Sequence, residues 1–238
     1  MKKNNRFIPR WAALSALFVA FIFTACNKTN DVQNTPVAGL MAFNLAPDKP
    51  SVGIALSNNS LTGTPLGYTS FTGGYYSIYP GTRTVDSYDF YTGTPIANSS
   101  YNFMASTYNS VFLVGANGTY KNVITVDNFD SLSGTSGKAY IRYINAIPDS
   151  SNVQVSAIAD GNNIIQETSR FTKISQFTGL NPGQVAVTIT TEGNIQASRT
   201  IDVVAKKAYT ILLTGIPGDA DPAKAMQIRF VENGQLAP

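Results

Sequence analysis

The sequence repeats itself at an offset of about 100 residues, and this duplication constrains the fold more than any other feature. Residues 43–48 (FNLAPD) align with residues 144–149 (INAIPD), and residues 111–115 (VFLVG) align with residues 211–215 (ILLTG). A period this long exceeds the roughly 20 to 50 residues of solenoid coils and propeller blades. About 100 residues is instead a common domain size. We therefore expect two tandem domains, each with its own core.

Within each copy the hydrophobic residues alternate with polar ones. Val185, Val187 and Ile189 are separated by Ala186 and Thr188, as in a strand with one buried face. Short segments of this kind are separated by Pro-Gly, Asn-Gly and Asp-Gly turns, and no segment after the N-terminal 25 residues shows sustained helical periodicity. The pattern predicts an all-β chain of two antiparallel β-sandwiches, with about seven strands in each.

The repeated Asn-x-x-Pro-Asp element closes the first strand of each copy. We expect Asp48 and Asp149 to accept backbone N–H groups in Asx-turns next to Pro47 and Pro148. The alternative is a calcium-binding or catalytic carboxylate, which is disfavoured because no second acid and no histidine lie nearby.

The N-terminus has the pattern of a secretory signal. Four basic residues within the first ten precede the uncharged run 11–25, which is shorter than the roughly 20 apolar residues of a membrane-spanning helix. Phe23-Thr24-Ala25-Cys26 resembles the bacterial lipobox, in which the cysteine is lipidated and becomes the first residue. The alternative is an ordinary cleavage site, but the only cysteine of an exported chain would then be an unpaired thiol. Cys26 is therefore predicted to bind the membrane through lipid, at the outer membrane, with the cell surface and the periplasmic face both left open.

These observations divide the chain into five segments. A Ser/Gly-rich stretch between the copies has the composition of a flexible linker that lets domains reorient. The segments are a signal peptide (1–25), a lipidated tether (26–37), a first sandwich (38–129), a linker (130–137) and a second sandwich (138–238).

The charge and the residue types exclude several functions. The first 25 residues contain four of the 17 Lys and Arg and none of the 14 acids, so the remaining chain has a net charge of minus one. Without a basic patch, a nucleic-acid partner is not expected. The sequence contains no histidine, which removes Ser-His-Asp and Cys-His nucleophiles and imidazole metal ligands. We expect neither catalysis nor a cofactor.

Two pairs of carboxylates need separate consideration. Asp86 and Asp89 lie three apart on an expected strand and so point to opposite faces. Asp219 and Asp221 lie in a loop and could contribute to a calcium site. A solvated turn is the favoured interpretation of this loop, because calcium gathers about six to eight oxygens and only two side chains are present.

Tyrosine is the residue type that most suggests binding. Nine of the twelve tyrosines lie between residues 68 and 120, in the first copy. Tyr75, Tyr76 and Tyr79 fall in an apparent insertion, Gly74 to Tyr79, that the second copy lacks. Tyrosine faces suit stacking on sugar rings or on a protein partner, so these three residues are a candidate ligand surface. The alternative is that they simply cover sandwich faces.

Residues 139–149 (AYIRYINAIPD) and the strand 208–215 (AYTILLTG) resemble a bacterial envelope family known only as a domain of unknown function. The resemblance implies immunoglobulin-like sandwiches and an envelope location, and it implies no reaction. The first copy departs from it, since Ala42 replaces Arg142 and the insertion is present.

A short motif in the linker suggests a modification. Asp130-Ser131-Leu132 resembles the sequon at which Bacteroidota O-glycosylate exported proteins, which makes Ser131 a candidate acceptor. Taken together, the features predict a lipid-anchored envelope protein with a non-catalytic binding, adhesion or structural role. The alternative is a glycan-capture lipoprotein that serves polysaccharide uptake, so the expected partners are the membrane and either a glycan or an envelope protein.

Overall fold

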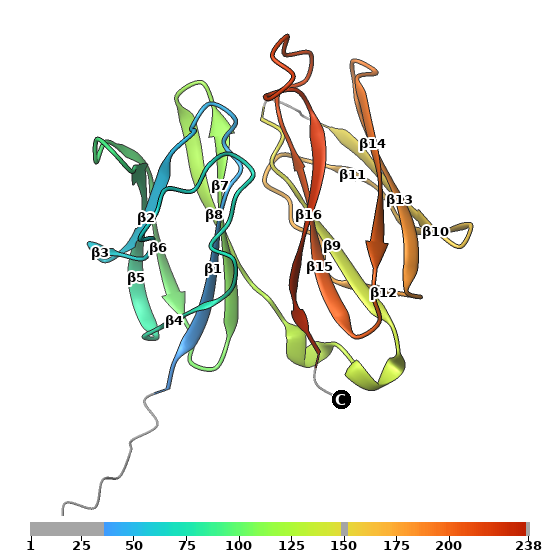
Figure 1. The fold of residues 1–238 in the computed structure, drawn as a ribbon, viewed down its shortest axis with the longest axis horizontal. Helices are drawn as coiled ribbons and strands as arrows, with labels where there is room; N and C mark the ends of the chain where they lie inside the picture. Colours follow the sequence, from blue (N-terminus) through green and yellow to red (C-terminus); the bar gives the residue numbers. More distant parts are fainter. Residues whose placement is uncertain (1–35, 149–151, 237–238) are drawn as a thin grey trace, which may run out of the picture. The chain divides into compact units, whose positions relative to one another are not determined.

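The computed structural model describes residues 36–148 and 152–236, and β-strands dominate them (Figure 1). The first copy contributes eight strands: β1 (Ala38–Asn44), β2 (Val52–Leu56), β3 (Asn59–Ser60), β4 (Tyr76–Ile78), β5 (Gly81–Asp89), β6 (Pro95–Phe103), β7 (Tyr108–Ala116) and β8 (Thr119–Val126). The second contributes β9 (Ala139–Asn145), β10 (Val153–Ala159), β11 (Asn162–Ser169), β12 (Thr178–Leu180), β13 (Gly183–Thr191), β14 (Gln196–Val203), β15 (Lys207–Thr214) and β16 (Gln227–Gln235).

Each copy forms a β-sandwich of two four-stranded sheets. The first pairs its strands in the orders β3-β2-β5-β6 and β4-β1-β7-β8, and the second in the equivalent orders β11-β10-β13-β14 and β12-β9-β15-β16. The predicted all-β fold of two tandem sandwiches is confirmed, with eight strands per copy instead of seven. The named strands pair antiparallel except that β1 runs parallel to β7 and β9 runs parallel to β15.

Each sandwich has its own hydrophobic core between its two sheets. Val185, Val187 and Ile189 of β13 are at most 1 % exposed, whereas Ala186 between them is exposed. The alternation read from the sequence therefore holds for this outer strand. The first core gathers Leu40, Ala42, Val52, Ile54, Val85, Phe103, Val111 and Leu113 in the same way.

A further apolar cluster joins the two sandwiches. It contains Met41, Phe43 and Leu45 next to β7 residues Phe112 and Val114, and it meets Ile144, Ala146, Leu212 and Val231 of the second copy. The sheets β4-β1-β7-β8 and β12-β9-β15-β16 thus face each other (Figure 1), and their central strands β1, β7, β9 and β15 are buried on both faces. Residues Pro36–Pro238 consequently form one compact unit.

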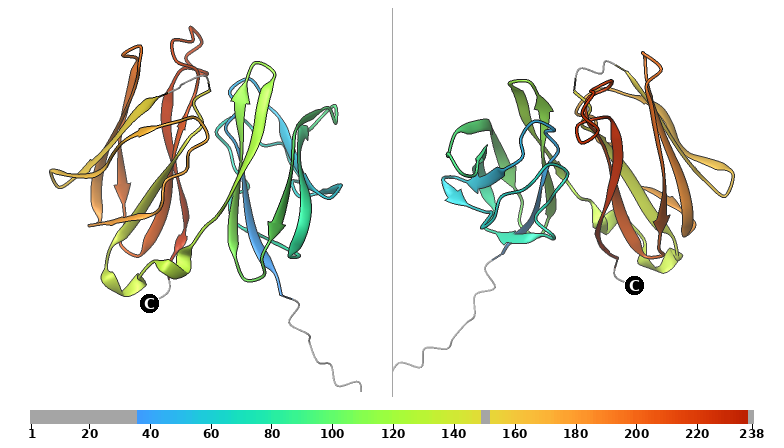
Figure 2. Two further views of the ribbon diagram at one scale, coloured as in Figure 1. Left: turned by 180° about the vertical axis from the view of Figure 1, so that it is seen from behind. Right: turned by 45° about the horizontal axis from the view of Figure 1, so that its top comes forward.

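The segment between the copies contains two short 3₁₀ helices, Phe129–Ser131 (η1) and Gly134–Ser136 (η2). Phe129 and Leu132 pack against Tyr140, Ala208 and Leu236, and the backbone N–H of Ser133 donates to the Tyr140 hydroxyl at 3.0 Å. The apolar residues Phe129 and Leu132 make the packing contacts, and the Ser/Gly composition of the segment did not indicate them. Figure 2 shows this yellow-green segment running from the first sandwich to one end of the second. None of the described helices has the length or the apolar character that crossing a bilayer requires.

The strand registers correct two alignments made from the sequence. Met41 pairs with Ser110 as Arg142 pairs with Thr210, so Met41, and not Ala42, occupies the position of Arg142. The prediction that Gly74 to Tyr79 is an insertion absent from the second copy is also wrong. Strand β4 pairs Ile78 with Ala38, and β12 pairs Leu180 with Ala139 in the same way. The tyrosine segment is therefore an edge strand that both copies possess, and its sequences differ too much for direct alignment.

The repeated Asn-x-x-Pro-Asp element makes its turn with asparagine. Asn44 Oδ1 accepts from the N–H of Ala46 and Asn145 Oδ1 accepts from the N–H of Ile147, both at 3.1 Å. The expected Asx-turn of Asp48 is thus wrong, because Asp48 Oδ2 reaches the β7–β8 turn and accepts from the N–H of Asn117 and the hydroxyl of Tyr120. Asp149 lies outside the described residues.

One glycine near the end of an inner-sheet strand is required in each copy. Gly115 has φ +115° and Gly215 has φ +101°, a region that L-residues with a Cβ rarely adopt. A Cβ at these positions would lie 2.1 Å from the Thr119 carbonyl oxygen and 2.3 Å from that of Ala225. The duplication therefore preserves a backbone constraint as well as the hydrophobic pattern.

Candidate functional site

A closed ring of polar side chains lies between the two sandwiches, near the end where the linker joins them. Tyr75 donates its hydroxyl hydrogen to Asp127 Oδ2 at 2.5 Å, and Asp127 Oδ1 lies 2.5 Å from Arg142 Nη2. Arg142 Nε donates to Thr210 Oγ1 at 2.9 Å, and Thr210 donates to Asn233 Oδ1 at 2.6 Å. Asn233 Nδ2 closes the ring by donating to the Tyr75 hydroxyl at 3.3 Å. Residues of both copies are thereby held in one arrangement.

The ion pair in this ring is almost completely buried. The side chain of Arg142 is 3 % exposed and that of Asp127 is 0 % exposed. Burying two charges costs several kcal/mol per ion unless geometry and further hydrogen bonds compensate. The Ser110 hydroxyl donates to Asp127 Oδ2 at 2.7 Å, and the guanidinium carbon of Arg142 lies 4.5 Å from the centre of the Phe177 ring. Both charges are thus compensated, and loss of either would leave the other buried and unpaired.

Tyr75 is held in this ring as a neutral hydrogen-bond donor. Burial raises the pKa of its hydroxyl, and the negative charge of Asp127 raises that pKa further. Deprotonation would place two negative charges in hydrogen-bond contact. The ring of polar groups therefore fixes both the protonation state and the orientation of Tyr75.

A groove of about 640 Å³ opens next to Tyr75. Its aromatic wall consists of Tyr75, Tyr108 and Phe129. Tyr75 meets Tyr108 edge to face with the ring centres 5.0 Å apart, and it meets Phe129 at 5.9 Å. The remaining lining residues come from the linker and from the end of β16: Asp130, Leu132, Ser133, Gly134, Thr135, Asn233, Gly234, Gln235 and Leu236. Both copies and the linker thus build the groove.

The lining of this groove suits a ligand with apolar faces and polar edges. Small-molecule sites are typically clefts of about 300–1,000 Å³, with apolar and aromatic walls and a few placed polar groups. Here Asp130, Ser133, Thr135 and Gln235 supply exposed polar groups around the rings. Tyrosine rings of this kind can stack on a sugar ring or on an apolar side chain.

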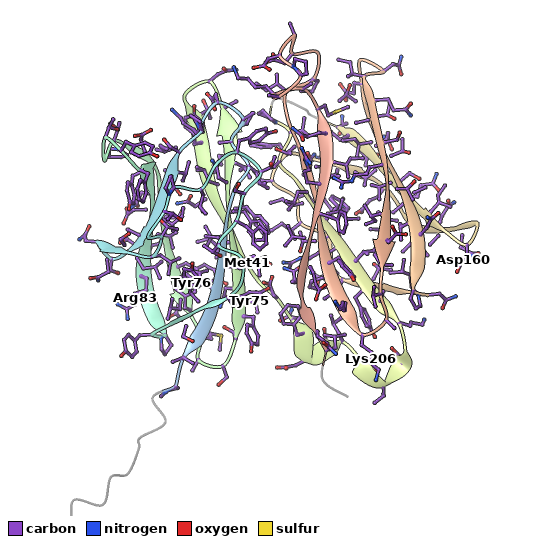
Figure 3. All side chains as sticks on the ribbon, viewed as in Figure 1. Met41, Tyr75, Tyr76, Arg83, Asp160 and Lys206 are labelled. Atoms are coloured by element: carbon purple, nitrogen blue, oxygen red, sulfur yellow. The ribbon has the colours of Figure 1, made fainter. Side chains whose placement is uncertain are left out.

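Of the three tyrosines predicted from the sequence, only Tyr75 lines the groove. Tyr76 and Tyr79 are 42 % and 65 % exposed, and Tyr76 lies on the edge strand β4. Figure 3 labels Tyr75 and Tyr76 in the lower half of the first sandwich. Tyr75, Tyr76 and Tyr79 therefore do not form one continuous stacking surface.

The two aspartates of the candidate calcium loop hold a turn. Asp219 Oδ1 accepts from the N–H of Asp221 at 2.8 Å, and Asp221 Oδ1 accepts from the N–H of Ala223 at 3.0 Å. Asp221 Oδ2 also lies 3.6 Å from Lys224 Nζ. Within residues 36–148 and 152–236, no group of three or more His, Cys, Asp or Glu side chains is placed to hold a metal ion.

The other acidic pair is likewise engaged in local hydrogen bonds. The hydrogen bond from the backbone N–H of Thr92 contributes most to lowering the pKa of Asp89. Asp86 accepts from the Asn98 side-chain amide across the β5–β6 pair.

Among the modification candidates, Ser131 is exposed and its hydroxyl donates to the Asn128 carbonyl at 2.7 Å. Cys26 lies outside the described residues.

Sequence reasoning missed Tyr108, Phe129 and Asn233, which are central to the groove and the polar ring. One signal was available at Tyr108. Gly39 interrupts an apolar strand, and a Cβ there would lie 2.6 Å from Tyr108 Cδ1. A glycine inside a strand often marks such a close approach, although the sequence does not reveal which side chain occupies the space.

Comparison with known proteins gives one family match that covers most of the chain. The model of a family described as Domain of unknown function (DUF4397) matches twice, over residues 38–156 and 139–238. The two matches confirm the predicted tandem copies of a family of unknown function. No curated protein matches the chain.

Several solved structures are similar at low identity. The chain is 9 % identical to the tip fimbrial protein Mfa3 of Porphyromonas gingivalis, with a TM-score of 0.28, covering 83 % of this chain and 99 % of that one. It is 9 % identical to a carbohydrate-binding module of family CBM26 from Eubacterium rectale Amy13K, solved with maltoheptaose, with a TM-score of 0.27 and coverage of 84 % and 98 %. A protein of Eubacterium rectale solved by NMR is 16 % identical, with a TM-score of 0.32 and coverage of 45 % and 100 %.

Proposed function

Because this chain belongs to the family described as Domain of unknown function (DUF4397), its function must be inferred from its own residues, and we propose that it is a lipid-anchored, non-catalytic binding protein of the bacterial cell envelope. The observation that carries the proposal is the aromatic groove, whose walls come from both sandwiches and the linker. Cys26 supplies the anchor, since several acyl chains hold a protein at a membrane far better than one.

The interface prepares the groove for binding. Tyr75 is fixed by Asp127 and Asn233 before any ligand arrives, and η1 places Phe129 opposite it. Affinity improves when side chains do not have to be ordered on binding. If the two sandwiches moved relative to each other, one wall of the groove would move relative to the other. The apolar cluster and the polar ring between the sandwiches oppose such movement. These contacts therefore support ligand binding as the role of the tandem arrangement.

The anchor and its location are tested in cells. We expect labelled palmitate to be incorporated into the full chain and to be lost in Cys26→Ala, whereas label retained by that variant would refute the anchor. Protease cleavage between Ser131 and Gly137 on intact cells would indicate the cell surface and adhesion. Protection on intact cells, with cleavage after lysis, would indicate an envelope partner in the periplasm.

A glycan-capture role is the second candidate, and the aromatic wall with its polar edge favours it. Affinity electrophoresis in gels containing neutral polysaccharides tests this role. We expect retardation of the wild type that is lost in Tyr108→Ala, because Tyr108 is 48 % exposed and lines the groove. Tyr91→Ala is the matched control, since Tyr91 is exposed but does not line the groove. Retardation that Tyr108→Ala leaves unchanged would count against this site.

The sequon at Ser131 is proposed as an O-glycosylation site. The residue is exposed, as an acceptor must be. An intact mass equal to that of the bare chain plus lipid would refute the modification.

A further inference from the structure

We propose that the end of the molecule that carries Val37 rests on the surface of the membrane that holds the lipid of Cys26. This inference rests on the proposed lipid anchor and adds to it a second, weaker contact made by the folded domains. The partner is the headgroup region of a phospholipid bilayer. The evidence is the distribution of exposed apolar side chains together with the length of the tether.

Exposed apolar side chains gather at this end. Among the described residues nine large hydrophobic side chains are exposed, and six of them belong to turns or strand ends on this side: Val37, Tyr76, Tyr79, Met104, Tyr108 and Val204. Tyr79 and Met104 are 65 % and 63 % exposed. We call these six residues the apolar end.

The strand registers place the first-sandwich members of the apolar end near the same end of the strands. Tyr76 pairs with Leu40 and Tyr108 with Gly39, so their side chains leave opposite faces of the sheet close to the start of β1. The backbone N–H of Ser106 donates to the Val37 carbonyl at 2.7 Å, which brings the β6–β7 turn with Met104 to the same place. Tyr79 precedes Gly81, which pairs with Phe103 directly before Met104.

Val204 of the second sandwich lies toward the same end. It follows β14 in the turn that contains Lys206, whose N–H donates to the Lys138 carbonyl at 2.7 Å next to the start of β9. Figure 3 labels Tyr76 and Lys206, and both lie toward the lower end of the view. The apolar end therefore includes residues of both copies.

The tether length favours a bilayer as the occupant. Val37 is eleven residues after Cys26, so the chain between them reaches at most about 40 Å. A partner held this close has a high effective concentration, and a weak contact is then enough for docking. Tyrosine is enriched at membrane interfaces because its ring is apolar and its hydroxyl is polar. Met104 and the two valines add apolar side chains without charge.

Contact with the bilayer would also constrain the groove. Tyr108 belongs both to the apolar end and to the aromatic wall. A bilayer resting against this end would therefore restrict the groove to ligands that reside at the membrane surface.

Tryptophan fluorescence can test this orientation. The only tryptophan of the chain, Trp11, precedes Cys26, so the processed protein has none, and Tyr79→Trp and Met104→Trp each introduce a single reporter at the apolar end. Tyr91→Trp is the matched control, because Tyr91 is 77 % exposed in the β5–β6 turn at the opposite end of these strands. Strands β5 and β6 are nine residues long, so the β5–β6 turn lies about 30 Å from the apolar end.

The full lipidated chain would be reconstituted into phosphatidylcholine vesicles with brominated acyl chains, which quench nearby tryptophan. We expect loss of emission for Tyr79→Trp and Met104→Trp and unchanged emission for Tyr91→Trp. Equal quenching of all three proteins, or of none, in vesicles to which the protein floats would overturn the orientation and leave the anchor intact. Failure of the protein to float with the vesicles would overturn the anchor and this inference with it.

Discussion

The two sandwiches share one pattern of strand pairing but present different faces to each other. Met41 of β1 and Arg142 of β9 occupy equivalent positions, paired with Ser110 and Thr210. The acid is present in the first copy alone. The backbone N–H of Asp127 donates to the carbonyl of Tyr108. Ala208 is the counterpart of Tyr108 in the second copy, and it pairs with Gly234, which has no side chain. One copy thus supplies the buried anion and the other supplies the cation.

This difference shows how a duplicated domain can bind its own copy specifically. In a symmetric contact each patch meets an identical patch, so identical copies would bring together two cations or two apolar residues at this position. The carboxylate that pairs with Arg142 comes from the first copy, and the apolar cluster is completed when Phe43 and Phe112 meet Leu212. The interface therefore specifies this pair of copies, because two second copies would bury two arginines without an acid and two first copies would bury Asp127 without a cation.

The largest expected effect comes from breaking the buried ion pair. Arg142→Met gives the second copy the residue that the first copy carries at this position. It leaves Asp127 buried without its cation, so we expect the free energy of unfolding to fall by about 3–5 kcal/mol. Chemical denaturation followed by circular dichroism would measure the loss.

The double variant Arg142→Met/Asp127→Asn provides the control. Replacing both charges of a buried pair is often close to neutral, so most of the lost stability should return. A single variant that costs less than about 1 kcal/mol, a value typical of exposed pairs, would show that this pair does not lock the copies.

How far the sequence predicts the structure differs between outer and inner strands. Outer strands such as β13 alternate because one face is in water, and the sequence identifies them directly. The inner strand β15 (KAYTILLT) is buried along nearly its whole length. Its apolar run is the signature of a strand covered on both faces. The sequence thus contained a sign of the interface but did not indicate what covers the second face.

The polar ring and the groove were less predictable. An arginine within the apolar strand β9 suggests a buried partner, but its acid, Asp127, lies beyond β8 near the linker and can be paired with it only in three dimensions. Tyr75 was identified as a candidate, although the supposed insertion is an edge strand present in both copies. Tyr108 and Phe129 reach the groove through long-range packing that leaves no local motif.

A smaller effect is expected from removing the Tyr75 hydroxyl. Tyr75→Phe takes one donor from Asp127 and the acceptor from Asn233, so we expect the free energy of unfolding to fall by about 1–3 kcal/mol at neutral pH.

The pKa of Tyr75 is raised in the folded state. As the pH rises above about 10, the Tyr75 hydroxyl therefore deprotonates in the unfolded chain before it does so in the folded protein. Wild-type stability should therefore fall as the pH rises above this value, and the advantage over Tyr75→Phe should shrink. Tyr91→Phe, at an exposed hydroxyl, is the control, and an advantage that stays constant to pH 11 would contradict the assignment.

The smallest effect should come from the exposed ion pair of the second sandwich, which differs from the Arg142 pair mainly in burial. Lys173 Nζ lies 2.6 Å from Glu167 Oε2, but the two side chains are 38 % and 39 % exposed. Solvent screening limits such a pair to about 0.2–1 kcal/mol, so Lys173→Met should cost no more than this.

The pair lowers the pKa of Glu167 and raises that of Lys173. Its contribution should therefore be lost as the pH falls through the lowered pKa of Glu167, and again as the pH rises through the raised pKa of Lys173. A double-mutant cycle with Glu167→Gln at pH 7 would measure the coupling. A coupling as large as that between Arg142 and Asp127 would show that burial is not what separates the two pairs.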